Sequence, residues 1–241
     1  MKKYKKIIIT LFILISLFGI VYSIYNLFKW KKDVNINKEI KEEINNSITV
    51  IEEKYIVDFA SLKNQNSDTV AYVKINNTNI DYVVVKGTDN AYYLRHNFKK
   101  EYNLGGWVFA DYKNKFDGTD KNIVIYGHNM RDGSMLAGLQ NFLNSNWNAN
   151  EENLKITLVT ENETATYQVF SVYKIEPEDY YINTEFKNDN EFHKFITTLR
   201  LRSIYDYKVS VNSNDSILTL STCVDNDLKR LVVHAKKIIE S

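Results

Sequence analysis

An uninterrupted apolar segment near the N-terminus constrains this chain more than any other feature. Ile7 to Phe28 comprises 22 residues without a charge. A helix of that length, rising about 1.5 Å per residue, can cross a hydrocarbon core of about 30 Å. No small-residue cleavage site follows the segment, which favours a retained anchor over a removed signal peptide. Tyr22, Tyr25 and Trp30 lie near its outer end, where amphipathic rings favour the membrane interface. We therefore expect a transmembrane signal anchor at residues 7–28, after a cytoplasmic tail at residues 1–6.

Charge divides the chain into two unlike parts. Residues 1–32 carry seven Lys and no acid, so the remaining 24 Lys and Arg face 30 Asp and Glu. A net-acidic body lacks the basic surface of a nucleic-acid binder, whose affinity comes mainly from Lys and Arg on phosphates. We expect no nucleic-acid partner. Lysines flank the apolar segment on both sides, so the positive-inside rule only mildly favours a cytoplasmic N-terminus.

The segment from residue 29 to residue 68 reads as a stalk and an N-terminal helix. Its charges alternate in sign, and five isoleucines recur at helical spacing: Ile36, Ile40, Ile44, Ile48 and Ile51. Such a stripe is typical of a helix with one face packed on a core. We expect this stripe to pack on a domain formed by residues 69–241.

From Val70 onward the sequence breaks into short apolar or alternating runs. Eight such runs, separated by turn residues, predict a mainly β domain, either a barrel or a sandwich. The runs are 70–75, 80–85, 107–110, 122–126, 154–160, 166–175, 216–221 and 231–239. The cluster Asn76 to Asn79 predicts a hairpin between the first two runs. Helical patterns at 135–142 and 191–203 interrupt the strands.

The chain contains one cysteine, Cys223, which therefore cannot form an intramolecular disulfide. It ends the alternating run Ile217 to Cys223, in which a period of two places Ser221 and Cys223 on one face. A strand end fixes the Cα position and leaves the sulfur open to a substrate. A free cysteine is also often a small buried apolar residue, so a structural role remains open from the sequence.

Arg230 and His128 are the two partners that the pattern offers to Cys223. Arg230 opens the run after a polar loop, so a hairpin would place it beside Cys223. There its guanidinium could favour the thiolate and bind an acyl oxyanion, although a surface ion pair is an equal alternative. His128 follows the run Asn122 to Gly127, just as Cys223 ends its own run. A cysteine and a histidine so distant in sequence can meet only through the fold.

The other histidines fit ordinary roles. His96 lies in a polar loop and His193 lies off the apolar stripe of its helix, so both read as solvated. His234 shares the strand face of Arg230 and reads as structural. Sequence motifs of zinc peptidases, serine hydrolases with a G-x-S-x-G elbow, P-loop enzymes and dinucleotide-binding enzymes are absent from the sequence.

These residues resemble the catalytic set of sortases, the membrane-anchored cysteine transpeptidases of Gram-positive bacteria. The resemblance is carried by Thr219-Leu-Ser-Thr-Cys223, Arg230-Leu-Val-Val and Tyr126-Gly-His-Asn-Met130. It is most similar to class B, on the further segments Ile80-Asp-Tyr-Val-Val-Val85 and Asp89-Asn-Ala-Tyr-Tyr-Leu94, and covers about residues 50–240. It implies an eight-stranded sortase-type β-barrel, with an N-terminal helix and a long helix before the last two strands.

The resemblance also implies an activity. Cys223 would attack the Thr carbonyl of a C-terminal sorting motif in a secreted protein and form a thioester. His128 would act as general acid and base, and Arg230 would stabilise the oxyanion. An amine of peptidoglycan or of its lipid-linked precursor would then take the acyl group. No metal or other cofactor is implied, and Glu178, Asp225 and Asp227 form no tight metal-loop pattern.

Five residues would line the peptide groove by the same resemblance: Ser221, Tyr181, Ile182, Asn90 and Leu94. For Tyr181, Ile182 and Leu94, core packing is an equal alternative. No orienting carboxylate for His128 is evident, although Asp132 and Asp225 are near in sequence.

The implied substrates place residues 33–241 outside the cell, on a single-pass anchor with a cytoplasmic N-terminus. Three other functions remain open from the sequence. A pilin-polymerising sortase would use a pilin lysine as its amine, and a membrane-tethered cysteine peptidase would use water with the same site. A non-catalytic binding module would leave Cys223 inert.

Overall fold

The computed structural model describes residues 2–52, 54–224 and 228–238. Its helices and short 3-10 helices are α1 (Lys2–Asn45), α2 (Phe59–Gln65), η1 (Tyr92–Leu94), η2 (Ala137–Leu143), α3 (Ser145–Asn148), η3 (Glu151–Leu154), η4 (Tyr180–Ile182) and α4 (Asp189–Arg202). Its strands are β1 (Ile48–Ile51), β2 (Lys54–Val57), β3 (Thr69–Ile75), β4 (Asp81–Val85), β5 (Phe109–Ala110), β6 (Asn122–Tyr126), β7 (Lys155–Thr160), β8 (Thr164–Ile175), β9 (Ile217–Val224) and β10 (Lys229–Ile238).

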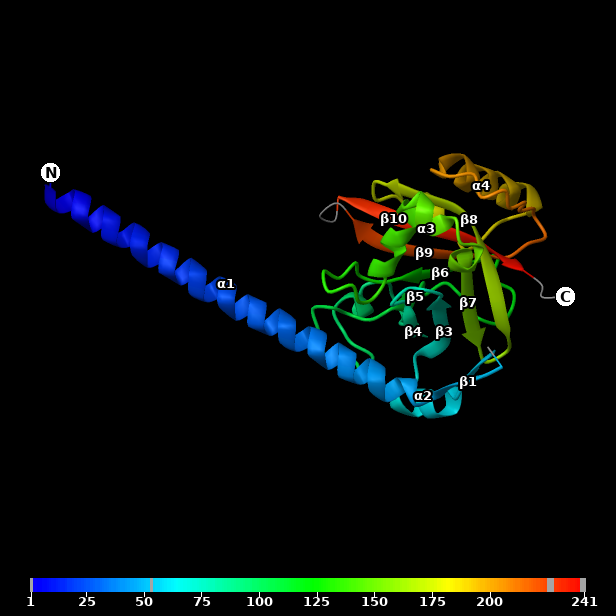
Figure 1. The fold of residues 1–241 in the computed structure, drawn as a ribbon, viewed down its shortest axis with the longest axis horizontal. Helices are drawn as coiled ribbons and strands as arrows, with labels where there is room; N and C mark the ends of the chain where they lie inside the picture. Colours follow the sequence, from blue (N-terminus) through cyan, green and yellow to red (C-terminus); the bar gives the residue numbers. More distant parts are fainter. Residues whose placement is uncertain (1, 53, 225–227, 239–241) are drawn as a thin grey trace.

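Eight strands close into a barrel in the order β10-β8-β7-β3-β4-β5-β6-β9. Two neighbouring pairs, β4 with β5 and β6 with β9, are parallel, and the other pairs are antiparallel. The hairpin predicted around Asn76 to Asn79 is confirmed, because β3 and β4 pair antiparallel across that turn. The prediction of a barrel with a long helix before the last two strands is also confirmed (Figure 1).

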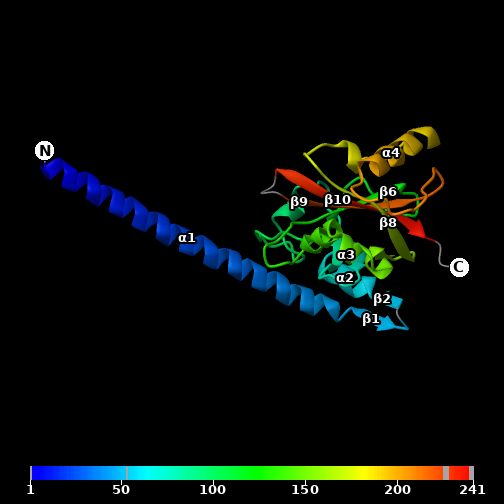
Figure 2. The same cartoon turned by 45° about the horizontal axis from the view of Figure 1, so that its top comes forward.

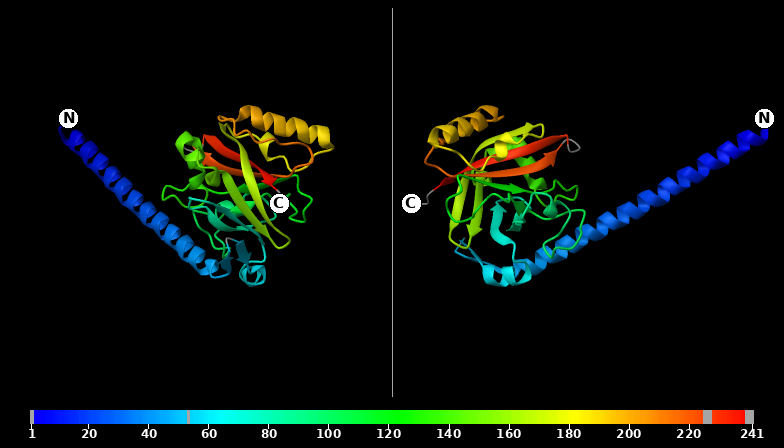
Figure 3. Two further views of the ribbon diagram at one scale, coloured as in Figure 1. Left: turned by 45° about the vertical axis from the view of Figure 1, so that its right-hand side comes forward. Right: turned by 180° about the vertical axis from the view of Figure 1, so that it is seen from behind.

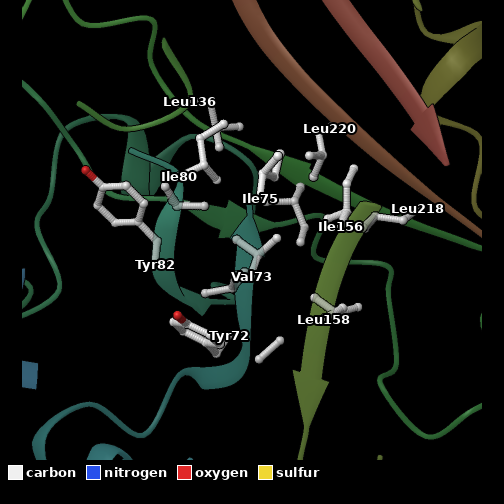
Figure 4. Packing of buried hydrophobic residues seen from close by; sticks show 14 of the residues in the cluster. Tyr72, Val73, Ile75, Ile80, Tyr82, Leu136, Ile156, Leu158, Leu218 and Leu220 are labelled. Carbon is white, nitrogen blue, oxygen red and sulfur yellow. The ribbon is translucent and has the colours of Figure 1, made fainter. Parts of the chain in front are cut away.

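Alternation along the strands separates the barrel interior from its outer face. Figure 4 shows side chains from three strands pointing into one interior: Val73 and Ile75 of β3, Ile156 and Leu158 of β7, and Leu218 and Leu220 of β9. On the outer face, α4 packs its predicted apolar stripe against β8, β9 and β10, through Phe192, Phe195, Ile196 and Leu199. Asn188 caps α4 by accepting from the backbone N–H of Glu191 at 3.0 Å.

Helix α1 runs without interruption from the apolar segment to the barrel. Its N-terminal part projects away from the domain, and its C-terminal part lies against the barrel near α2 (Figures 1 and 2). By length and composition, the helix can cross a membrane, and its apolar window has none of its surface buried in the protein. Helix α4 lies on the opposite side of the barrel from α2 (Figure 3).

The isoleucine stripe is confirmed for one part of the N-terminal segment and wrong for the other. Ile40 and Ile44 of α1 are buried in the core, and Ile36 packs against it. Ile48 also packs against the core, but Ile48 and Ile51 belong to strand β1 and not to the helix, and Ile51 is 52% exposed. The polar residues Asn45, Asn46 and Ser47 favour a turn over helix continuation, and the β-branched run after them favours a strand.

Smaller differences concern the predicted segments after residue 106. The strand expected at 107–110 covers only Phe109–Ala110, and the strand expected at 216–221 extends to Val224. The helix expected at 135–142 is the 3-10 helix η2, whose hydrogen bonds span three residues, such as Leu139 N–H to Leu136 C=O at 3.1 Å. Residues 225–227 and 239, which the predictions include, lie outside the described residues.

Candidate functional site

Three adjacent strands bring the distant site segments together. Strand β9 lies between β6 and β10, parallel to β6 and antiparallel to β10. Partners in the register project to the same face of a sheet. The outer face of this part of the barrel therefore carries the odd-numbered residues of β9, from Ile217 to Cys223, and α4 covers only the Ile217 end.

The parallel register between β6 and β9 ends two residues before His128 and Cys223. Tyr126 of β6 is the partner of Ser221 of β9. Each chain then advances two residues in the same direction, to His128 and to Cys223, on strands about 4.8 Å apart. Gly127 holds the two chains together at this end, because its carbonyl accepts from the Thr222 hydroxyl at 2.7 Å. Both His128 and Cys223 are half-buried.

The antiparallel register places Arg230 on the other side of Cys223. The two residues are direct Cα partners in the β9–β10 hairpin, as the sequence predicts. Directly opposite residues have Cβ atoms about 5 Å apart. Arg230 is half-buried, and its Nη1 donates to the Lys229 carbonyl at 3.3 Å. The two registers therefore pair Cys223 with Arg230 and direct the segment of His128 toward the same end of β9.

A backbone carbonyl, rather than a carboxylate, contacts His128. The Nε2 atom of His128 lies 2.8 Å from the Leu94 carbonyl oxygen. Since a carbonyl only accepts, Nε2 carries a proton, and Nδ1 is the nitrogen that can exchange one. Asp132, one of the two carboxylates near in sequence, accepts from the backbone and hydroxyl of Ser134 within its own turn. Asp225 lies outside the described residues.

Two of the predicted groove residues meet next to the thiol. The Tyr181 hydroxyl lies 3.1 Å from the Ser221 hydroxyl, and both residues are buried. Burial raises the pKa of Tyr181, with the Ser221 hydrogen bond and the charge of Arg230 opposing the shift. The side chains of Tyr181 and Ile182 also pack against the α4 cluster, so apolar packing and proximity to the site occur together.

Asn90 joins the site through a carboxylate that the sequence analysis missed. Asp111 is 2% exposed, and its Oδ2 accepts from the Asn90 amide and from the Tyr126 hydroxyl, both at 2.8 Å. The other side of Asn90 accepts from the Tyr112 N–H at 3.1 Å. Tyr126 is the register partner of Ser221, so this network borders the same face. Nothing in the sequence pattern connects Asp111 to residues so distant along the chain.

The other three histidines have contacts away from Cys223. His234 is fully buried, with Nε2 2.9 Å from the Tyr173 hydroxyl and Nδ1 2.9 Å from the Thr219 hydroxyl. His193 is exposed on α4, and His96 stacks on the Tyr92 ring. Glu178, considered above as a metal ligand, pairs with Arg202. Among the residues that the structure describes, no group of three His, Cys, Asp or Glu side chains could hold a metal ion.

Comparison with known proteins decides the family. The sortase-domain family pattern matches residues 73–238. The chain belongs to the sortase family, class B. It is 31% identical to sortase B of Staphylococcus aureus over 99% of this chain and 98% of that protein. It is 34% identical to sortase B of Listeria monocytogenes over 85% of this chain and 77% of that protein.

The solved structures agree with the sequence relatives. The crystal structure of Clostridium perfringens sortase B aligns with a TM-score of 0.71 and 40% identity, over 75% of this chain and 99% of that one. The Staphylococcus aureus sortase B–substrate complex aligns with a TM-score of 0.71 and 34% identity, over 76% of this chain and 85% of that one. This class B sortase is thus a cysteine transpeptidase in general type, with one cysteine in its sequence.

Proposed function

We propose that this sortase joins secreted proteins to a cell-wall amine, with Cys223 as nucleophile, His128 as general acid and base, and Arg230 as oxyanion stabiliser. The observation that carries the proposal is the register of β6, β9 and β10. It pairs Cys223 with Arg230, and it pairs Ser221 with Tyr126, two residues before His128; both His128 and Cys223 are half-buried. A nucleophile, a proton carrier and a fixed positive charge are what acyl transfer from a peptide bond requires.

The first half-reaction forms a thioester. The Cys223 thiolate attacks the carbonyl carbon of Thr in the sorting motif, and the carbonyl oxygen becomes an oxyanion beside the Arg230 guanidinium. The tetrahedral intermediate collapses as the C–N bond breaks. His128 gives its proton to the leaving amine and becomes neutral, with Nε2 still donating to the Leu94 carbonyl.

The second half-reaction returns the enzyme to its starting state. An amine of the peptidoglycan cross-bridge, or of its lipid-linked precursor, attacks the thioester carbonyl. His128 accepts the proton that the amine nitrogen loses, the new C–N bond forms and the C–S bond breaks. Cys223 leaves as a thiolate. One peptide bond is exchanged for another, so no external energy source is needed.

The named relatives support the substrate classes. One similar structure is a Staphylococcus aureus sortase B–substrate complex, and another is sortase B complexed with triglycine, a short peptide that presents a free amine. Tyr181, Ser221, Ile182, Asn90 and Leu94 surround the thiol as a groove for the sorting peptide in this proposal. Residues 7–28 anchor the enzyme, with residues 33–241 outside the cell.

Mass spectrometry of the full chain in detergent tests the proposal. The protein is incubated with a library of sorting-signal pentapeptides, with and without an oligoglycine or diaminopimelate-type amine. We expect an acceptor-ligated peptide with the wild type and none with Cys223→Ala, His128→Ala or Arg230→Ala. His193→Ala is the matched histidine control and should retain activity. Cleavage without ligation would favour a peptidase, and absence of any thioester would favour a binding module.

A further inference from the structure

The last turns of α1 contact the barrel through buried polar side chains. Asp33 accepts from the Leu104 N–H at 3.0 Å with its carboxylate, and its backbone carbonyl accepts from the Asn103 amide at 2.9 Å. Asn37 donates to Asn103 Oδ1 at 3.1 Å and to the Gly106 carbonyl at 3.0 Å. Asp33 and Asn37 are 7% and 6% exposed. Apolar packing alone would not need this many directed bonds, so the contact fixes one particular arrangement of residues 103–106.

The loop held by α1 in turn holds the segment around Leu94. Asn103 N–H donates to the Arg95 carbonyl at 2.8 Å, and Trp107 N–H donates to the Tyr93 carbonyl at 2.9 Å. These two bonds lie on either side of Leu94 in the sequence. The orientation of the Leu94 peptide unit therefore depends on the position of residues 103–107.

Gly106 shows how closely the two segments approach. Its φ is +55°, and a Cβ atom there would lie 2.8 Å from the Leu94 carbonyl oxygen. Only glycine fits both the backbone conformation and the space. The Leu94 oxygen is the acceptor for His128 Nε2. A continuous set of contacts thus leads from α1 to the imidazole.

A second set of contacts leads from α1 to the backbone of His128. The Lys41 ammonium lies 4.1 Å from the centroid of the Tyr82 ring. The Tyr82 hydroxyl accepts from the Met135 N–H at 2.9 Å, and Leu136 N–H donates to the His128 carbonyl at 3.0 Å. The loop that follows His128 is therefore also closed against a residue that α1 covers.

We propose that Asp33 and Asn37 are positioning residues for His128, and that α1 must stay docked on residues 103–106 for the imidazole to be oriented. The inference rests on the role of His128 in the proposed function. When the contact between α1 and residues 103–106 is lost, the Leu94 carbonyl shifts and Nε2 of His128 loses its acceptor. The imidazole then samples orientations in which Nδ1 can no longer exchange a proton with the substrate. The effect falls on the chemical step rather than on peptide affinity.

Two Asn/Asp exchanges one turn apart on α1 give a matched test in the full chain in detergent. Asp33→Asn keeps an oxygen that can accept from Leu104 N–H, so it should behave as wild type. Asn37→Asp replaces the side-chain NH2 group by an oxygen, which then faces two acceptors, Asn103 Oδ1 and the Gly106 carbonyl. We expect kcat to fall about tenfold, with KM within about twofold of wild type. Asp33→Ala and Asn37→Ala should lose kcat in the same way. Glu43→Gln removes the charge from the exposed ion pair of α1 with Lys99 and should change neither constant.

Alkylation of Cys223 supplies a readout that a purely structural role would not move. Since Cys223 is the single cysteine, the rate of iodoacetamide labelling reports it alone. We expect the pH profile of this rate in Asn37→Asp to move toward that of His128→Ala. A wild-type kcat and profile in Asn37→Asp and Asn37→Ala, beside an inactive His128→Ala, would overturn this inference alone. An active His128→Ala would overturn both this inference and the assignment of His128.

Discussion

At the residue scale, the buried hydroxyl pair of Tyr181 and Ser221 is expected to affect peptide binding more than the chemical step. Tyr181→Phe keeps the packed ring and removes the hydroxyl, which is 3.1 Å from Ser221. This bond orients the Ser221 hydroxyl in the proposed groove, and a neutral hydrogen bond contributes about 1 kcal/mol. Peptide binding must then order Ser221, so we expect KM for the sorting peptide to rise about fivefold, with kcat changed less. Steady-state kinetics measure both constants.

The neighbouring tyrosine is the control for this substitution. Tyr180 is 40% exposed, and its hydroxyl contacts Thr198 on α4. Tyr180→Phe should leave KM and kcat unchanged. An equal loss in both variants would mean that the η4 segment, and not the Tyr181 hydroxyl, determines peptide binding.

Also at the residue scale, His234 makes stability depend on pH. Thr219 donates its hydroxyl proton to Asn122, so it accepts from Nδ1–H of His234, and the bare Nε2 accepts from Tyr173. Burial lowers the pKa of His234 to about 3 from the usual 6.5. Between those values the unfolded chain binds a proton that the folded chain does not. The free energy of unfolding therefore falls as pH falls, by roughly 1.4 kcal/mol per pH unit from this group.

Urea denaturation between pH 4 and pH 7.5 measures this dependence. We expect a shallower pH slope in His234→Gln, whose amide can both donate and accept. His193→Gln alters an exposed histidine and should keep the wild-type slope. Parallel slopes in wild type and His234→Gln would contradict the expectation.

At the element scale, two isoleucines of the N-terminal segment test the boundary between helix α1 and strand β1. Ile44 of α1 is fully buried, whereas Ile51 of β1 is 52% exposed. Ile44→Ala should lower the free energy of unfolding by roughly 2–5 kcal/mol, because it leaves a cavity. Ile51→Ala should stay within about 0.5 kcal/mol of wild type. Denaturation followed by tryptophan fluorescence compares them, and equal losses would favour the continuous helical stripe that the sequence pattern suggests.

The sequence predicts well the elements in which buried residues recur at a regular spacing. Short apolar or alternating runs mark all eight barrel strands, and a stripe of period 3.6 marks α4. The β1–β2 hairpin was missed because Ile48 and Ile51 also satisfy helical spacing. The pairing of Cys223 with Arg230 was predictable from the polar loop between two strand-like runs. The sequence could not predict the contact of the Leu94 carbonyl with His128, the role of Asp111, or the contacts of Asp33 and Asn37 with residues 103–106. A backbone acceptor or a partner distant in sequence leaves no local pattern.

At the scale of the whole molecule, the orientation of the proposed anchor decides which side of the membrane holds the thiol. A membrane-impermeant thiol reagent added to intact cells should label Cys223. In Cys223→Ser with Lys5→Cys, the single cysteine lies in the expected cytoplasmic tail, and labelling should appear only after the membrane is permeabilised. Intact-mass measurement of the purified protein detects both products. The reverse result would place the barrel in the cytoplasm and exclude wall anchoring.

The place of β9 between β6 and β10 also affects when the enzyme becomes active. The β6–β9 pairing joins segments about 95 residues apart, and such distant pairing forms slowly because a long loop must close first. Until β9 pairs with β6, Cys223 lies apart from His128, although the local β9–β10 hairpin already pairs it with Arg230. In the proposed mechanism, closure of the barrel is therefore the step that brings His128 to Cys223. On this proposal, a chain whose barrel has not yet closed lacks the general acid and base, so the exported protein gains its activity only on folding.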